Sequence, residues 1–227
     1  MFEHVLRGGC VRWGAGFVLW MCCVWPVTAL WAQPAAATHS TALAARLQAA
    51  QTSAPLAQQL YALGQKVATV CVHCHAQGKS TDLLEAPYLD GQNPAYLMEQ
   101  MRQFAQGQRK NSFMQGILKP MTVDEMVGVV LFYAQAPLPA RIPSDTARVP
   151  QGKAYYHRVC VACHGADGHG NARLPRIAGQ HAGYVQLTLQ RYRDGSHARS
   201  DANMAFVTRN MVDADIQAVA AYLETLP

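Results

Sequence analysis

The pattern Cys-x-x-Cys-His occurs twice, at residues 71–75 and 160–164, and it constrains this chain more than any other feature. It is typical of covalent c-type haem attachment: two thiols form thioethers with the haem vinyl groups, and the adjacent histidine ligates the iron. We therefore predict two covalently attached haem c groups. Their thioethers are expected at Cys71, Cys74, Cys160 and Cys163, and their iron ligands at His75 and His164.

Two other chemistries use paired cysteines. Two Cys-x-x-Cys pairs can share one tetrahedral zinc ion, and a single pair is the redox motif of thioredoxin-like proteins. Here the pairs begin 89 residues apart, each is followed by histidine, and each lies in its own copy of a longer repeat. These observations favour haem over both alternatives.

The N-terminal residues have the features of a targeting segment. Arg7 and Arg12 precede an uncharged apolar run at 13–30 and a stretch of small residues at 32–37. This order predicts a secretory signal peptide over residues 1–32; the alternative is an uncleaved membrane anchor. Covalent haem attachment in bacteria takes place outside the cytoplasmic membrane, so both features predict the periplasm.

The net charge indicates no polyanionic partner. The chain carries a formal charge of +5, and haem propionates would offset most of it. Its basic residues form no long cluster, so we expect no nucleic-acid binding.

Aligning Cys71 with Cys160 reveals a duplication. The turn at residues 87–92 matches that at 175–180 at an offset of 88. Apolar periodicity predicts helices in each copy, with Thr122 and Asp213 as caps, and no strand pattern competes. The predicted helices span 56–70, 94–106 and 123–134 in the first copy and 152–159, 182–193 and 213–226 in the second.

The domain organisation follows from this repeat. Residues 33–52, rich in Ala, Gln and Thr, are expected to be a tether or a loosely held helix. The two domains are predicted at 53–136 and 151–227. A proline-rich linker, expected to be extended, joins them at 137–150.

The chain resembles the dihaem cytochromes c of the c4 type, which are all-α and consist of two tandem class I cytochrome c domains. The resemblance covers about residues 56–227. The motifs that carry it are the duplicated haem motifs, the Gly-Gln turns, Gly64 and Gly152 in the leading helices, and Phe132 and Tyr222 in the closing helices. In this family the leading and closing helices cross at the glycine, with the aromatic residue packed on it.

The resemblance also implies the remaining ligands. The carbonyls of Pro87 and Pro175 would accept hydrogen bonds from the two histidines. Met114 and Met204, which lie 39 and 40 residues after His75 and His164, would be the sixth iron ligands from an irregular stretch between helices. A neutral thioether raises the potential. We expect the other helical methionines to fill the core and five further histidines to be solvated: His73, His157, His169, His181 and His197.

A haem with two protein ligands passes electrons and needs no acid, base or nucleophile. We therefore expect an electron carrier and not an enzyme. The resemblance implies a quinol-oxidising complex as donor and a terminal oxidase as acceptor, with docking at a membrane-complex surface. One alternative is the cytochrome subunit of a dehydrogenase that oxidises a sulfur compound or an alcohol. Another is a dihaem peroxidase, which would need one haem with an open or displaceable ligand.

The first copy departs from the family pattern near its haem. Residues 76–79 stand where the second copy has residues 165–170, which are closer to the family pattern. Asp90 stands where the second copy has Ala178. We expect these changes to alter the electrostatics of the first haem without changing its ligands.

Overall fold

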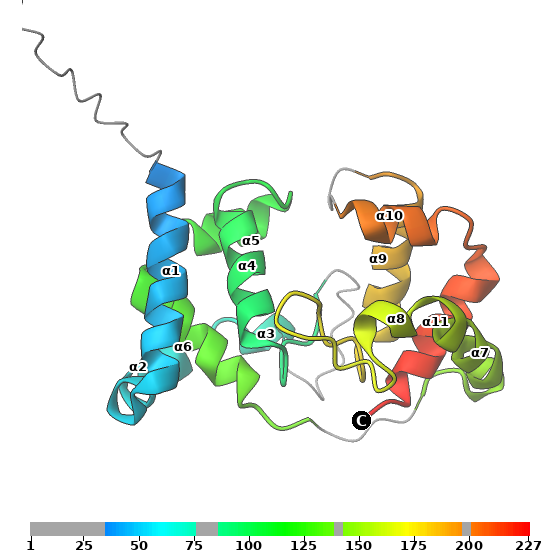
Figure 1. The fold of residues 1–227 in the computed structure, drawn as a ribbon, viewed down its shortest axis with the longest axis horizontal. Helices are drawn as coiled ribbons and strands as arrows, with labels where there is room; N and C mark the ends of the chain where they lie inside the picture. The colour runs from blue at the N-terminus through cyan, green and yellow to red at the C-terminus, as the bar shows by residue number, and fades with distance from the viewer. Residues whose placement is uncertain (1–34, 76–85, 139–142, 197–200) are drawn as a thin grey trace, which may run out of the picture. The chain divides into compact units, whose positions relative to one another are not determined.

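The structure is a computed structural model that describes residues 35–75, 86–138, 143–196 and 201–227. Within these ranges the regular secondary structure is helical and contains no strand, as predicted (Figure 1). The signal segment at 1–32 lies outside the described residues. No helix among the described residues is long and apolar enough to cross a membrane.

The same order of helices occurs twice. In the first half, residues 53–136, the helices are α2 (Ala54–Val67), α3 (Val72–His75), α4 (Pro94–Ala105), α5 (Ser112–Leu118) and α6 (Val123–Ala134). In the second half, residues 151–227 together with the start of their first helix, they are α7 (Val149–Val159), α8 (Val161–His164), α9 (Ala182–Arg193), α10 (Ala202–Thr208) and α11 (Asp213–Glu224). Each half has its own cluster of buried apolar side chains.

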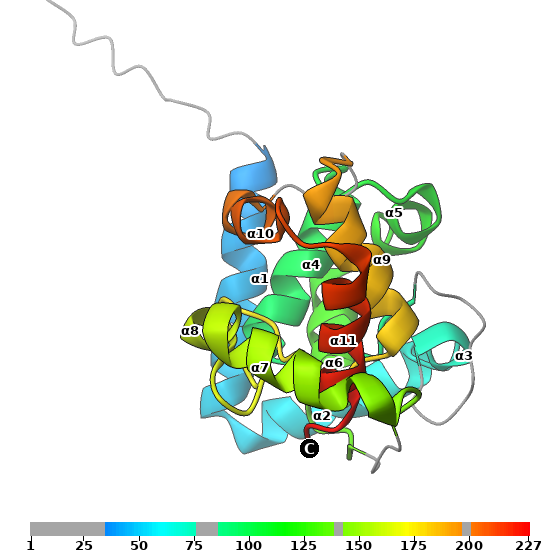
Figure 2. The ribbon, with the colours of Figure 1, turned by 90° about the vertical axis from the view of Figure 1, so that its right-hand side faces the viewer.

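Glycine allows the leading and closing helices of each half to touch backbone to backbone. A Cβ atom on Gly64 would lie 2.0 Å from the carbonyl oxygen of Gly128, and one on Gly152 would lie 1.9 Å from that of Ala218. Figure 2 shows α7 crossing α11 at this contact. Tyr222 packs there as expected, with its Cβ 2.8 Å from the same Gly152 position.

The expected tether is a packed helix. From Ala35 onward the segment forms α1 (Ala35–Thr52), which buries Leu43 and Leu47 against the first half. Its Arg46 makes two hydrogen bonds to the Asp124 carboxylate, at 2.7 and 2.8 Å. The leucines are four residues apart and therefore share one helix face, which gives this segment a packing role that its low-complexity composition did not reveal.

The linker is less extended than predicted. Residues 146–148 form a 3₁₀ turn, η1 (Thr146–Arg148), and α7 begins at Val149, three residues earlier than expected. Pro150 is compatible with this start because the first turn of a helix needs no backbone N–H donor. Ser144 attaches the preceding segment to α11 through hydrogen bonds to Glu224 at 2.7 Å.

One of the two predicted caps is correct. The Thr122 hydroxyl accepts a hydrogen bond from the Glu125 N–H while the Glu125 carboxylate accepts one from the Thr122 N–H, forming a capping box at the start of α6. Asp213 does not cap α11, whose cap position is Val212. Asp213 instead pairs with Arg193 at 2.6 Å.

The glycine crossing gives a direct test of the packing. We expect Gly64→Ala to destabilise the protein by about 1–3 kcal/mol, because the added methyl group must separate two backbones. Gly116→Ala is the matched control, since a Cβ there meets nothing within 4 Å and Ala favours a helix by about 0.5–1 kcal/mol. Denaturant unfolding of the haem-loaded proteins measures both. Equal stability of the two variants would contradict the assigned crossing.

Candidate haem sites

Each haem motif forms one helical turn. The N–H groups of Cys74 and His75 both donate to the Cys71 carbonyl, at 3.1 and 2.9 Å. In the second half Cys163 and His164 donate to the Cys160 carbonyl in the same way, at 3.2 and 3.0 Å. Residues at i, i+3 and i+4 lie on one face of a helix, so the two thiols and the imidazole of each motif face the same side.

A proline carbonyl orients each histidine ring. Nδ1 of His75 lies 2.7 Å from the Pro87 oxygen, and Nδ1 of His164 lies 3.2 Å from the Pro175 oxygen. A carbonyl can only accept, so Nδ1 carries the proton and the lone pair is on Nε2, the form that binds a metal. Burial lowers the pKa of both rings, which keeps them neutral. These are the hydrogen bonds that the resemblance implies.

The two methionines lie in helices that the sequence did not predict. Met114 is in α5 and Met204 in α10, each seven residues long, and not in irregular segments. The Asn111 and Asp201 side chains cap these helices by accepting the Met114 and Met204 N–H groups, both at 2.9 Å. Both methionines are half-buried, whereas Met98, Met101 and Met126 are buried in the core. Iron ligation by Met114 and Met204 stays a prediction.

Three buried donor groups are compatible with a haem that carries acidic propionates. Tyr133 Oη, Arg176 Nε and Ser196 Oγ are buried and have no hydrogen-bond partner among the residues that the structure describes. Burial also lowers the pKa of the Arg176 guanidinium, and the charge of Asp167 opposes this shift in part. Unpaired buried donors are costly, and carboxylates supplied by a ligand would satisfy them. The four motif cysteines form no disulfide and remain available for thioethers.

Other titratable residues do not assemble a second site. Among the described residues no three His, Cys, Asp or Glu side chains gather in a way that could hold a bare metal ion. His73 and His157 are exposed, while His169 lies beside Asp167 at 3.1 Å. His181 differs from expectation: it is half-buried and caps α9 by accepting the Tyr184 N–H. His197 lies outside the described residues.

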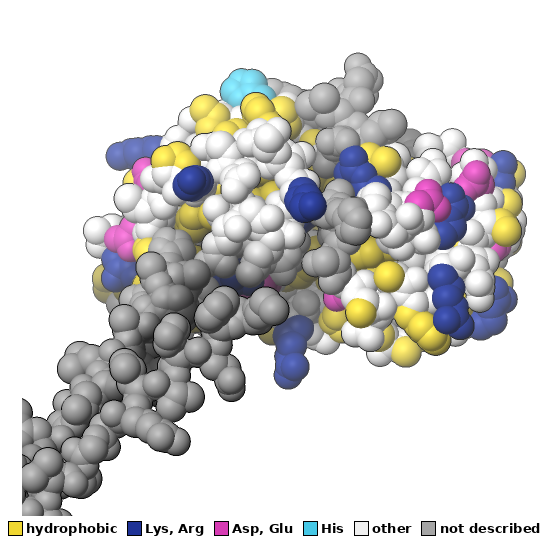
Figure 3. All heavy atoms as spheres, turned by 90° about the horizontal axis from the view of Figure 1, so that it is seen from above, with side chains coloured by type: hydrophobic (Ala, Val, Ile, Leu, Met, Phe, Trp, Pro, Cys, Tyr) yellow, Lys and Arg dark blue, Asp and Glu magenta, His cyan; other side chains and the backbone are white. Residues whose placement is uncertain are grey.

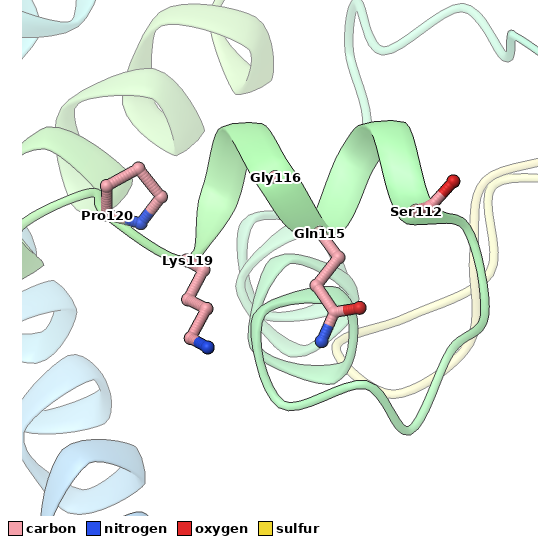
Figure 4. A pocket seen from close by; sticks show the side chains of 5 residues that line it. All are labelled: Ser112, Gln115, Gly116, Lys119 and Pro120. Atoms are coloured by element: carbon pink, nitrogen blue, oxygen red, sulfur yellow. The ribbon is translucent and has the colours of Figure 1, made fainter.

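A pocket of about 730 Å³ opens beside α5 (Figure 4). It is lined by Ser112, Gln115, Gly116, Lys119 and Pro120, with the Gln115 and Lys119 side chains on the same side of the helix. This lining contains no thiol, imidazole or carboxylate.

Known proteins share this arrangement. The cytochrome c family model matches residues 149–227. Cytochrome c4 of Thiocapsa roseopersicina is 31% identical over 191 residues, which cover 78% of this chain and 97% of the relative. A thiosulfate dehydrogenase electron acceptor of Thiomonas intermedia is 30% identical over 174 residues, covering 70% of this chain and 80% of the relative.

A solved structure agrees with the sequence relatives. Reduced cytochrome c4 from Pseudomonas stutzeri superposes with a TM-score of 0.64 at 26% identity, covering 72% of this chain and 97% of the other. The chain belongs to the cytochrome c family, as a dihaem cytochrome of the c4 type. It thus carries covalently bound haem c and transfers electrons, and it is not an enzyme.

The proposed methionine ligand can be tested in the second half. We expect Met204→Ala to lower the potential of one haem by more than about 59 mV, a tenfold change in the equilibrium constant of a one-electron couple, because thioether ligation favours ferrous iron. An optical redox titration and carbon monoxide binding measure this. Met211→Ala removes a buried methionine of the same half and should leave ligation unchanged. An unaltered titration of Met204→Ala would remove Met204 from the ligand set.

The thioethers are tested separately. We expect Cys160→Ser to leave the second half with a single thioether, and Cys71→Ser to do the same in the first half. Mass spectrometry of the fragments from each half and the pyridine haemochrome spectrum count the remaining bonds. Two full sets of thioethers in both variants would contradict the assignment of these cysteines.

Proposed function

We propose that this protein is a periplasmic carrier in a respiratory chain, which delivers electrons to a terminal oxidase. The observation that carries the proposal is the repeat of one haem motif, with a buried histidine oriented by a proline carbonyl in each half. The proposed iron ligands are His75 with Met114 and His164 with Met204. The bound haem iron supplies one-electron exchange between its ferric and ferrous states.

The protein residues support electron transfer without chemistry on a substrate. The imidazoles hold the Nδ1 proton and direct Nε2 toward the metal, and burial of each site favours ferrous iron by penalising the extra charge of the ferric state. As iron ligands, Met114 and Met204 would fill the coordination position that a peroxidase needs for its substrate. The carrier function therefore depends on Met114 and Met204 as ligands.

The surface near the proposed methionine ligands suits brief redox encounters. Phe113 and Phe206, neighbours of Met114 and Met204 in their helices, are 67% and 61% exposed. The Arg209 guanidinium lies over the Phe206 ring at 4.2 Å. Figure 3 shows a face on which separate Lys and Arg side chains are interspersed with apolar ones. Small, mixed surfaces of this kind are typical of transient electron-transfer complexes.

A second candidate donor is a thiosulfate dehydrogenase. The relative in Thiomonas intermedia is named as the electron acceptor of that enzyme, and it matches 70% of this chain. This similarity favours the sulfur-compound alternative over an alcohol dehydrogenase. In both candidate functions the protein carries electrons. The two functions differ only in the donor that reduces the protein.

Export is the remaining part of the proposal. We infer that residues 1–32 direct the chain to the periplasm, where its haems are attached. Cleavage within the small-residue stretch gives a free carrier, whereas retention of the N-terminal segment gives a carrier tethered to the membrane. The mass of the protein isolated from a periplasmic fraction separates these two forms.

Reduction kinetics test the donor. The oxidised protein is mixed in a stopped-flow instrument either with a quinol-oxidising membrane complex and quinol, or with a thiosulfate dehydrogenase and thiosulfate. We expect second-order reduction of both haems by the quinol-oxidising complex, followed by reoxidation by a terminal oxidase. Faster reduction by the thiosulfate enzyme would favour the second candidate. Failure with both donors, or rapid carbon monoxide binding by the native reduced protein, would contradict the carrier function.

A further inference from the structure

Two glutamines connect the halves through a reciprocal set of buried hydrogen bonds. The Gln92 side chain accepts from the Arg176 N–H at 2.7 Å and donates to the Arg176 carbonyl at 2.8 Å. The Gln180 side chain accepts from the Tyr88 N–H at 2.8 Å and donates to the Tyr88 carbonyl at 3.0 Å. Both glutamines are buried, with 6% and 7% exposure. Each therefore satisfies both backbone groups of one residue in the opposite half.

The glutamine side chains are also held in place within their own half. Oε1 of Gln92 accepts a second hydrogen bond, from the Asn93 N–H at 2.9 Å, and Oε1 of Gln180 accepts one from the His181 N–H at 3.0 Å. With two donors on the oxygen and a carbonyl acceptor for the amide, each side chain has a defined orientation. This orientation places Oε1 on a specific backbone N–H of the other half.

That N–H belongs to the peptide group that orients the iron-binding histidine. The Pro87 carbonyl, which accepts from His75 Nδ1, and the Tyr88 N–H, which donates to Gln180, are parts of one amide. The same relation holds in the second half: the Pro175 carbonyl accepts from His164, and the N–H of the same amide, on Arg176, donates to Gln92. Two hydrogen-bond chains thus cross the interface in opposite directions.

We propose that each glutamine tunes the haem of the opposite half by polarising the amide that binds its histidine. An amide whose N–H donates to a good acceptor has a more negative carbonyl oxygen, and hydrogen bonds linked in this way strengthen one another. The stronger carbonyl draws the Nδ1 proton and gives the imidazole more anionic character. Ferric iron is then favoured, so the intact chain lowers the potential. Gln92 and Gln180 are positioning residues that touch neither the iron nor its ligands.

This inference rests on the proposed ligation by His75 and His164, and it assigns each effect to a specific haem. The first haem, attached at Cys71 and Cys74, responds to Gln180. The second haem, attached at Cys160 and Cys163, responds to Gln92.

The test substitutes one glutamine in the haem-loaded protein. In Gln180→Met a side chain of similar length no longer accepts from the Tyr88 N–H. We expect the ferrous-to-ferric ratio of the first haem, at a fixed applied potential, to shift about threefold toward ferrous iron, and the second haem to stay unchanged. A redox titration followed by the hyperfine-shifted haem methyl signals gives each haem its own potential. The signals that change in Met114→Ala and in Met204→Ala assign the two sets to their halves.

Two further variants exclude a purely structural effect. Gln180→Glu keeps an oxygen acceptor for the Tyr88 N–H, so we expect the first haem to return to its original ratio or to shift toward ferric iron. Asn93→Ala removes a side-chain amide that lies 2.8–3.0 Å from three carbonyls of the second half but contacts neither tuning amide. We expect it to leave both potentials unchanged.

The outcomes separate this inference from the proposed function. A shift of the second haem in Gln180→Met, equal shifts of both haems, or the same shift in Asn93→Ala would overturn the cross-half tuning. So would an unchanged first haem in a Gln180→Met protein that folds and binds both haems. If Gln180→Met fails to fold, Gln92→Met provides the mirror test on the second haem. Loss of histidine ligation in the unsubstituted protein, detected in its spectrum, would instead refute the proposed function.

Discussion

The hydrogen bond from a buried histidine to a proline carbonyl, present in both halves, is the contact on which each site depends. It selects the Nδ1–H tautomer, fixes the ring plane and leaves Nε2 for the metal. The helical turn of the Cys-x-x-Cys-His motif brings two thiols to the same side as that ring. The groups proposed for covalent attachment and iron ligation are therefore positioned by one short segment and one carbonyl outside it, and the remaining helices keep these two parts together.

The glycine crossing provides that support. Because Gly64 and Gly152 let the leading helix approach the closing helix without a side chain between them, the segment that continues from each leading helix into the haem motif starts from a fixed position. The buried Tyr156 of α7 extends this link: its hydroxyl donates to the Gly165 carbonyl at 2.6 Å, directly after His164. The packing of α7 against α11 thereby also positions the backbone next to His164, the proposed iron ligand.

The sequence was sufficient for features that depend on local pattern. The helices flanking the motifs follow from apolar periodicity, and the capping box at Thr122 from a threonine followed by a glutamate three residues later. Helices α5 and α10 were missed because seven residues are too few to show a period. The sequence signal for these two helices was the pair of capping residues, Asn111 and Asp201. They are separated by the same number of residues as Met114 and Met204.

Long-range partners account for the other differences. Aspartate is a residue type that often caps helices, but the Asp213 carboxylate forms an ion pair with Arg193 of another helix instead. Leu43 and Leu47 have helical spacing in a segment of low complexity, and only the fold shows the surface that they cover. The glutamines of the two Gly-Gln turns could be aligned with each other from sequence. Their hydrogen bonds, however, join residues 84 and 92 positions apart, which no local pattern reveals.

The duplication does not make the two sites equivalent. The histidine-to-carbonyl distance is 2.7 Å in the first half and 3.2 Å in the second, and a shorter hydrogen bond gives the imidazole more anionic character. Asp90 in the first turn is replaced by the buried Ala178 in the second. A carboxylate and a more anionic imidazole both stabilise ferric iron, whereas the Arg176 cation in the second half acts in the opposite direction. The two halves therefore differ both in the hydrogen bond that orients the histidine and in the charge carried by the neighbouring turn.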